Sequence, residues 1–440
     1  MKDNQVMKNL IKFSLPLILS GILQQLYSWA DAFIVGNVEG ETALAAIGAT
    51  GTVINLYILV ITGFTLGLNI IFAQNYGSGK IEKITIMLST YVLALGGIFL
   101  VVSIAGYSLA TPLLHAMNTT TDTIGLASSY LKIVMIGIPF LAVYNVYSAA
   151  LRGIGDSRTP FYSVLFSSVV NVILDVVFVY ILRWGVNGAA VATILSQILM
   201  TVFLIIYAIK KHRVLRFKWT KEMWDQDSLV YGARYGIPPM IQSSITALGS
   251  LLLQNFMNGF GTLTVAAITT AYRVDTILLL PITNLGSAIS TLVAQNYGAG
   301  KKEEMRRTLK DGAILMFLVC PAIGALVYAY GGVVVGWFGV GAEALKIGTD
   351  FFKEIAAFYL LFGLFTAVRG YLEGIGDVLY SSLVGIVGLV VRIIASYALK
   401  PFLGRAIIAY AEVISWVVLL LLYVVRIKYQ DRRKEKANLI

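Results

Sequence analysis

The chain has 440 residues, of which 58% are hydrophobic and 13% are charged, and its formal net charge is +11. A soluble domain usually carries about 25% charged residues, so this chain has too little polar surface for water and is expected to lie in a membrane. Cys320 is the only cysteine, and His115 and His212 are the only histidines, which excludes an intrachain disulfide and a histidine cluster for a transition metal.

Twelve stretches of the sequence are long and apolar enough to cross a bilayer as helices. A spanning helix needs about 20 mostly apolar residues, and continuous runs of this length do not fit the alternating pattern of barrel strands. We therefore predict an all-α polytopic membrane protein with twelve transmembrane helices. In chain order the predicted spans are residues 11–36, 46–73, 86–111, 128–151, 160–182, 186–209, 229–257, 265–293, 311–336, 349–370, 379–399 and 403–427.

The basic residues gather in alternate connections between these spans. They lie within residues 2–12, 80–83, 152–158, 210–221, 301–310 and 426–436. The connections on the other side carry only Arg183, Lys346, Lys400 and Arg405. The positive-inside rule then predicts that both termini are cytoplasmic and that the protein lies in the plasma (inner) membrane. A basic face opposite anionic lipids explains the net charge without nucleic acid as a partner.

An internal repeat divides the sequence into two similar parts. The segment Ala73–Lys80 (AQNYGSGK) recurs as Ala294–Lys301 (AQNYGAGK), and Gly153–Asp156 (GIGD) recurs at the same offset as Gly374–Asp377. We call this constant offset, which takes Ala73 to Ala294, the repeat shift; Pro16 pairs with Pro238 at an offset one position larger. Each repeat holds six spans, an even number, so both enter the membrane in the same direction. This predicts two six-helix bundles related by a pseudo-two-fold axis along the membrane normal.

The repeat also predicts the domain organisation. We expect an N-terminal six-helix lobe over residues 1–209, a basic cytoplasmic linker over 210–228, and a C-terminal six-helix lobe with a basic cytoplasmic tail over 229–440. A cleft between two such lobes is the natural path for a substrate, and rocking of one lobe against the other would give alternating access.

Polar residues at membrane depth mark candidate functional sites, because charged groups in hydrocarbon are costly. In the first repeat they form stripes at helical spacing. These stripes are Gln24, Tyr27 and Asp31 in the first span, Asn145, Ser148 and Arg152 in the fourth, Ser168, Asn171 and Asp175 in the fifth, and Thr193 and Gln197 in the sixth. Four polar stripes cannot all face lipid, so we predict that they line an internal hydrated cavity.

Two carboxylates that face one cavity have a clear physical use. Asp31 and Asp175 together can carry a proton, or they can bind Na⁺ with help from oxygen atoms of Asn171 and Thr193. The alternative is that these residues form a structural hydrogen-bond network between the first, fifth and sixth spans. Pro16 lies about four turns before Asp31 and is expected to bend the first span. The bend either couples protonation of Asp31 to the shape of the cavity or is a passive kink.

The second repeat does not keep this set of residues, since Asn171 and Asp175 correspond to Arg392 and Ser396, and Asp31 corresponds to a leucine. It has other charged residues inside its spans, which we assign to structural ion pairs. These are Arg273 and Asp275 in the eighth span, Arg392 in the eleventh and Glu412 in the twelfth. Arg273 and Asp275 are two residues apart and point to different faces of a helix, so each is expected to pair with another span.

No residue pattern indicates catalysis or a bound cofactor. The sequence has no Ser-His-Asp, Cys-His or HExxH arrangement, and Gly77–Lys80 lacks the first glycine and the final Ser or Thr of a phosphate loop. We therefore predict no catalytic residues, no transition metal and no cofactor. An ion gradient is left as the source of energy, with H⁺ or Na⁺ as the coupling ion.

Several of these segments together resemble a known transporter family. They are Pro16 and Asp31 in the first span, the Ala-Gln-Asn-Tyr-Gly loop, Arg152–Pro160 (RGIGDSRTP), Asn171–Asp175 (NVILD) and Gly185–Thr193 (GVNGAAVAT). This combination resembles the multidrug and toxic compound extrusion (MATE) family over nearly the whole chain.

The resemblance implies a twelve-helix, V-shaped exporter that expels cationic or amphipathic drugs in exchange for H⁺ or Na⁺. It implies a cation site in the N-terminal lobe and a drug cavity beside it. The implied cation site comprises Asp31, Asn171, Asp175 and Thr193, and the implied cavity residues are Gln24, Tyr27, Asn145, Ser148, Ser168 and Gln197. One branch of the family has acidic residues in the seventh and tenth spans that form a second cation site. Here the seventh span has none, and Glu354 lies near the outer end of the tenth, so coupling through the first lobe is expected.

Two other functions remain open from the sequence. A flippase for lipid-linked oligosaccharide or peptidoglycan precursors belongs to the same superfamily, but its cavity needs several cationic side chains for pyrophosphate, and this first repeat offers chiefly acids. A membrane-embedded enzyme or a channel is the alternative from another class. The expected partners are small-molecule drugs or metabolites and membrane lipids, and the protein is expected to be a monomer.

Overall fold

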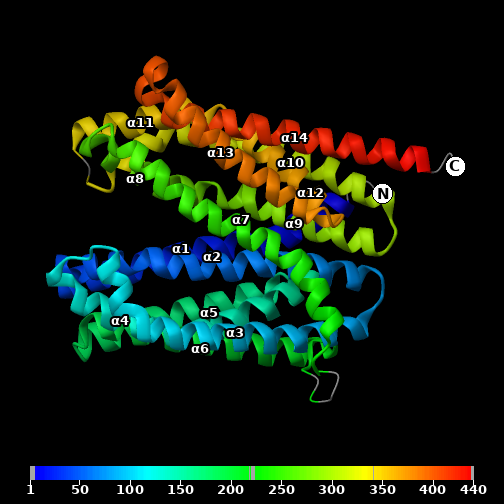
Figure 1. The fold of residues 1–440 in the computed structure, drawn as a ribbon, viewed down its shortest axis with the longest axis horizontal. Helices are drawn as coiled ribbons and strands as arrows, with labels where there is room; N and C mark the ends of the chain where they lie inside the picture. The colour runs from blue at the N-terminus through cyan, green and yellow to red at the C-terminus, as the bar shows by residue number, and fades with distance from the viewer. Residues whose placement is uncertain (1–4, 218, 220–222, 340, 438–440) are drawn as a thin grey trace. The chain divides into compact units, whose positions relative to one another are not determined.

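The fold is known from a computed structural model that describes residues 5–217, 219, 223–339 and 341–437, the last five by their backbone alone. All regular secondary structure in this part of the chain is helical (Figure 1). Lys2, Lys218 and Lys221 of the predicted basic segments lie outside the described residues, as do the side chains of Arg433, Lys434 and Lys436.

Fourteen α-helices follow one another in the described residues. They are α1 (Gln5–Glu39), α2 (Glu41–Gly77), α3 (Ile81–Ala116), α4 (Thr121–Gly153), α5 (Arg158–Asp175), α6 (Gly185–Lys211), α7 (Gln226–Asn258), α8 (Thr262–Leu278), α9 (Leu280–Gly298), α10 (Lys302–Gly336), α11 (Ala342–Ala356), α12 (Tyr359–Gly374), α13 (Val378–Leu403) and α14 (Ile407–Ala437). A π-helical segment, Val176–Ile181, continues α5, and short 3₁₀ turns lie at Arg213–Leu215 and Gly404–Ala406.

By length and composition, these helices supply one membrane span for each span predicted from the sequence. Within the described residues, eight single helical segments qualify, two bent helix pairs (α8 with α9, α11 with α12) qualify as one span each, and the stretch 378–432 contains both α13 and α14. Counting α13 and α14 separately gives twelve. The prediction of an all-helical membrane protein with twelve spans is therefore confirmed.

The repeat in the sequence is also a repeat of helix boundaries. The repeat shift takes both ends of α2 onto the two ends of the α8–α9 pair, and both ends of α4 onto the two ends of the α11–α12 pair. The second repeat differs in that both of its counterparts are bent, by 42° between α8 and α9 and by 54° between α11 and α12.

The two bends have different local causes. Pro281, the second residue of α9, has no N–H to donate and its ring clashes with the carbonyl four residues earlier. Val60 stands at the matching position of α2, which is continuous. At the other bend the N–H of Phe358 binds the carbonyl of Ile355, three residues back, at 2.9 Å, and this tighter turn ends α11.

The chain divides into two compact units. The N-terminal unit comprises residues 19–240, and the C-terminal unit comprises residues 1–18 and 241–440. Both divisions fall inside helices, two residues after Pro16 in α1 and soon after Pro238 and Pro239 in α7. α1 is nevertheless one helix from Gln5 to Glu39. The lobes predicted from the repeat remain a prediction, because compactness and sequence repetition are different criteria.

Each unit has its own buried core. In the N-terminal unit α4 packs against α2, α3 and α6, and Figure 1 shows α3, α4 and α6 running beside one another. Phe72, Leu131 and Leu151 are fully buried there. In the C-terminal unit the main contacts join α9 to α12 and α13 to α14. Helices in lipid associate through close packing and polar contacts rather than through exclusion of water, so small residues at the contacts matter.

The repeated Gly-Ile-Gly-Asp motif shows how such a contact is built. A Cβ atom added to Gly153 would lie 2.5 Å from Phe72 Cβ, and one added to Gly374 would lie 2.7 Å from the Ser290 carbonyl oxygen. Both glycines therefore permit close helix packing. The second glycines, Gly155 and Gly376, have φ values of 92° and 94°, which side chains disfavour.

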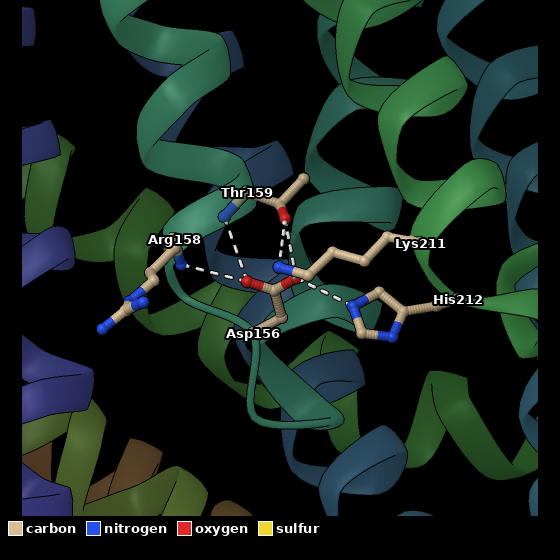
Figure 2. A network of polar contacts seen from close by, with 5 residues as sticks. All are labelled: Asp156, Arg158, Thr159, Lys211 and His212. Atoms are coloured by element: carbon tan, nitrogen blue, oxygen red, sulfur yellow. Dashed lines mark hydrogen bonds and ion pairs between the residues drawn. The ribbon is translucent and has the colours of Figure 1, made fainter.

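The aspartate of the motif ties the loop after α4 to the end of α6 (Figure 2). Asp156 Oδ1 accepts the N–H groups of Arg158 and Thr159, the first of α5, at 3.2 and 3.1 Å. Its Oδ2 accepts the Thr159 hydroxyl at 2.6 Å and Lys211 Nζ at 2.9 Å, and lies 2.8 Å from His212 Nε2. In the second repeat Asp377 likewise accepts hydrogen bonds from Arg426 and Gln430 of α14.

These contacts decide the charge state of Asp156. Burial alone raises the pKa of Asp156, but the hydrogen bonds from Thr159, Lys211 and His212 outweigh it and lower the pKa to about 2. A carboxyl group whose pKa is depressed in the folded state stabilises the fold above its unfolded pKa, and that stabilisation is lost as pH falls through the folded pKa.

We predict that Asp156→Ala lowers the free energy of unfolding by about 1–2 kcal/mol at pH 7, because α5 loses the acceptor for its first N–H groups and α6 loses an ion pair. The difference from the wild type should shrink between pH 4 and pH 2. Thermal unfolding in detergent at pH 4 and at pH 2 measures this difference. Asp122→Ala, at an exposed position, is the matched control. A difference that stays constant down to pH 2 would contradict the assignment.

Candidate functional site

The two candidate carboxylates of the first repeat lie in the N-terminal unit. Asp175 is the last residue of α5 and is fully buried, and Asp31, on α1, is partly buried. They are close enough for the charge of Asp31 to act on Asp175. The fold thus brings together two acids that are far apart in the sequence.

Several polar atoms around these acids have no hydrogen-bond partner. Within the described part of the chain they are both carboxylate oxygens of Asp175, Oδ1 of Asp31, and Oδ1 and Nδ2 of Asn171. Leaving a buried polar group unpaired costs about 1–3 kcal/mol. So many at one place favour a binding site over a structural network, because a structural network would be internally satisfied.

The donor set suits either of the two candidate ions. Asp31 and Asp175 can accept protons, and the carboxylate oxygens with Asn171 Oδ1 are hard oxygen ligands of the kind that Na⁺ accepts. The Thr193 hydroxyl donates to the Ala189 carbonyl at 3.0 Å, which leaves its oxygen lone pairs for a cation. The described residues contain no group of three or more His, Cys, Asp or Glu that could hold a metal ion, so any Na⁺ would depend on amide and hydroxyl oxygens as well.

Two tyrosines of α4 belong to this site and were missed from the sequence. Tyr130 is 5% exposed, lies within electrostatic reach of Asp31 and Asp175, and contacts the Thr193 hydroxyl. Tyr144 interacts with Tyr27 and with the serines at 148 and 163. The repeat held a signal, because the repeat shift takes Tyr130 and Tyr144 to Phe351 and Phe365. The hydroxyl groups occur only in the repeat that carries the two acids.

The predicted cavity residues are not all alike in their surroundings. Tyr27 lies near Asp31 and Tyr144, whereas Gln24 is exposed on α1 and Gln197 is partly buried on α6. Asn145 and Ser168 are buried and donate to carbonyls of their own helices, at Leu141 and Val164, both at 2.8 Å. Ser148 is also buried, and Arg152 Nε donates to its carbonyl at 3.3 Å.

The backbone changes at Asp175. The helix becomes π-helical over Val176–Ile181, where the N–H of Leu182 binds the carbonyl of Val177, five residues back, at 2.8 Å. π-Helical turns are rare and frequently lie at functional sites. In the second repeat α13 passes the corresponding positions as an α-helix. The first repeat has two more residues between Asp156 and Gly185 than the second has between Asp377 and Gly404, and the wider turn accommodates added length.

The charged residues of the second repeat form a different arrangement. Arg392 of α13 donates hydrogen bonds to Glu412 of α14 and, at 3.0 Å, to the Tyr272 hydroxyl of α8. Asp275 is buried and accepts a hydrogen bond from the Tyr359 hydroxyl of α12. Arg273 is exposed on the other face of α8.

Two further charged groups lie in the C-terminal unit. Arg369, on α12, donates to Glu373 at 2.6 Å and to Gln242 of α7 at 3.0 Å, and this group was missed from the sequence. Glu354 is partly buried beside Asp350 and Arg405.

Comparisons with known proteins match both repeats of the chain to one family. The model of the MatE family matches the chain twice, over residues 16–177 and 238–398, once in each repeat. The probable multidrug resistance protein YpnP of Bacillus subtilis is 29% identical over 382 residues, which cover 86% of this chain and 84% of that protein. The probable multidrug resistance protein NorM of Thermotoga maritima is 25% identical, covering 97% and 94%.

Solved structures share the fold over almost the full length. A multidrug resistance MATE family transporter in an outward-facing conformation superposes with a TM-score of 0.90 at 21% identity, covering 98% of this chain and 99% of that one. A transporter of the MOP superfamily from Pyrococcus furiosus superposes with a TM-score of 0.88 at 21% identity, covering 97% and 98%.

We predict that Asn171→Leu stabilises the folded protein, by about 1–3 kcal/mol, because it removes two unpaired buried polar atoms while keeping the side-chain volume. The midpoint of thermal unfolding in detergent should rise. Asn145→Leu is the matched control, since it removes an amide that already has a hydrogen bond, and its midpoint should not rise. Equal effects of the two substitutions would show that the Asn171 amide is satisfied.

Proposed function

Because the chain belongs to the MATE family of transporters, we propose that it is a secondary active exporter that expels cationic or amphipathic drugs in exchange for H⁺ or Na⁺. Membership of this family places the protein among transporters and not among enzymes. The observation that carries the proposal is the pair Asp31 and Asp175, which lie within electrostatic reach of each other and have buried oxygen atoms without hydrogen-bond partners. The relatives described as multidrug resistance proteins support the substrate class.

The proposed mechanism rests on competition for negative charge. When Asp31 and Asp175 are ionised, they attract a cationic drug to the surrounding cavity, which in this proposal is lined by Gln24, Tyr27, Asn145, Ser148, Ser168 and Gln197. Entry of H⁺ or Na⁺ neutralises the carboxylates and removes that attraction, so the drug is released. Alternating access completes the cycle, because the site must face the cytoplasm when it takes the drug and the outside when it takes the ion.

The neighbouring hydroxyl groups fit this exchange. Tyr130 lies near both acids and contacts Thr193, so it can donate to whichever carboxylate is ionised and hold the pair in place. Thr193 and Asn171 add oxygen ligands if the ion is Na⁺. Pro16 interrupts the hydrogen bonding of α1 about four turns before Asp31, and a change of bend there would link the charge of Asp31 to the shape of the cavity.

The same reasoning gives the cellular setting. A multi-pass membrane protein with its basic connections on one side is expected in the cell membrane with both termini in the cytoplasm. The proposed substrates are small molecules, and no cofactor is needed, because the ion gradient supplies the energy. We propose that the protein works as a monomer in contact with membrane lipids.

We predict that Asp31→Asn and Asp175→Asn each abolish gradient-driven export, since an amide can neither take up a proton nor supply the charge that attracts a cation. Efflux of a fluorescent cation from proteoliposomes should fall to the rate of protein-free vesicles. Asp122→Asn, on the exposed start of α4, is the control and should transport normally. Normal export by either site variant, in protein that elutes as folded, would refute the coupling role.

A second experiment identifies the coupling ion. A pH gradient and a Na⁺ gradient are imposed separately on proteoliposomes that hold the wild-type protein, and dye extrusion is followed. We expect one of the two gradients to drive extrusion, because the oxygen ligands of the site can bind either H⁺ or Na⁺. Extrusion under neither gradient would instead favour the flippase of the same superfamily, whose lipid-linked substrate carries pyrophosphate.

A further inference from the structure

A cavity lined by residues of the C-terminal unit alone takes no part in the mechanism above. It has a volume of about 380 Å³ and is bordered by α7, α8, α12, α13 and α14. Pockets for small molecules have volumes of roughly 300–1,000 Å³, so it can hold a compact organic ligand. The residues that give it its chemical character are Tyr272, Asp275, Phe362, Arg392, Glu412 and Trp416.

Among the described residues, one carboxylate at this cavity is not part of an ion pair. Arg392 and Glu412 form an ion pair, and Arg392 also donates to the Tyr272 hydroxyl, so these two charges offset each other. Asp275 has no cationic partner of its own and accepts a hydrogen bond only from the neutral Tyr359 hydroxyl among the described contacts. When Asp275 is ionised, the ionisable groups that border the cavity carry one net negative charge, which favours a monovalent cation.

The walls of the cavity indicate what kind of cation fits. Tyr272, Phe362 and Trp416 are aromatic, and the rings of Phe362 and Trp416 meet with centroids 5.2 Å apart. Aromatic faces attract organic cations and stack against planar rings. A small inorganic cation needs several oxygen ligands, and Glu412, one of the two carboxylates at this cavity, is committed to Arg392.

This cavity is not a remnant of the site in the N-terminal unit. The repeat shift pairs Asp275 with Ile54 and Tyr359 with Ile138, so the acid and its hydrogen-bond donor have no polar counterparts in the first repeat. Conversely, Asp175 corresponds to Ser396, which donates to a backbone carbonyl of its own helix. The two repeats therefore place their unmatched acids at different positions.

We propose that the C-terminal unit contains its own binding site for a monovalent organic cation with an aromatic ring, in which Asp275 is the counter-ion and Tyr272, Phe362 and Trp416 form the walls. The proposal rests on the proposed export of cationic compounds, and it adds a binding site separate from Asp31 and Asp175.

Equilibrium binding of ethidium, a planar aromatic cation, tests the proposal. Fluorescence anisotropy is measured on the purified full-length protein in detergent, with Asp31→Asn and Asp175→Asn both present so that the acids of the N-terminal unit do not contribute. Ethidium should still bind to this background. Adding Asp275→Asn should weaken binding on the order of tenfold, the effect of losing about 1.4 kcal/mol.

A second variant tests the cavity without changing Asp275, in case Asp275→Asn misfolds. Ser250 is exposed at the border of the cavity, so Ser250→Trp fills the space without removing a buried group, and it should weaken ethidium binding similarly. Thr262→Trp, in a neighbouring groove of the same unit, is the matched control and should leave the affinity unchanged.

The outcomes separate this proposal from the proposed function. If the wild type binds ethidium but the Asp31→Asn, Asp175→Asn background does not, the C-terminal site is refuted and the exporter stands. Unchanged affinity in both Asp275→Asn and Ser250→Trp refutes it as well, as does displacement of ethidium by Na⁺ at constant ionic strength, which would indicate an inorganic cation site. If the wild type binds no ethidium, the proposed substrate class itself fails, and this proposal fails with it.

Discussion

Inside a bilayer a polar group has no water to bind, and the fold follows from this constraint. Backbone N–H and C=O groups must be paired within the protein, which makes helices the natural form for spans of this length. Side chains face the same rule, and most obey it. Arg392 is paired with Glu412, and Asn145 and Ser168 donate to carbonyls of their own helices. The unpaired oxygen atoms of Asp175 stand out against this background. They carry a cost that binding of a proton or cation would recover.

The two repeats show which features the scaffold requires and which belong to function. The Gly-Ile-Gly-Asp motif is retained in both because each residue has a backbone role. Gly153 and Gly374 allow two helices to pack closely, and Asp156 and Asp377 fasten a loop to the last helix of the repeat. The buried polar residues of the candidate site are not retained. A phenylalanine in place of a tyrosine keeps the packing and lacks only the hydroxyl group. A tyrosine in one repeat that matches a phenylalanine in the other therefore marks a hydroxyl group that serves something other than packing.

Much of the fold could be predicted from the sequence, because apolar length and the constant shift between repeats are local signals. The twelve spans and the grouping of polar stripes depend only on hydropathy and helical spacing. The contacts between helices could not be predicted, since periodicity shows which face of a helix is polar but not what lies opposite. Thus Asp275 was assigned to a structural ion pair, whereas its partner is the neutral Tyr359. The π-helical turn after Asp175 and the tight turn at Phe358 also depend on backbone pairing that no residue pattern of the span reveals.

Coupling between an ion and a drug requires that each change the binding of the other. Two cations that compete for Asp31 and Asp175 satisfy this requirement through charge alone, because neutralisation of the carboxylates removes the attraction for the drug. A cation held by Asp275 is bound by other residues and does not compete for those carboxylates. Such a site would add affinity for aromatic cations without adding to the coupling. The proposed division therefore assigns energy conversion to the N-terminal unit and part of substrate recognition to the C-terminal unit, which explains why the second repeat could lose the coupling acids and still keep charged residues at membrane depth.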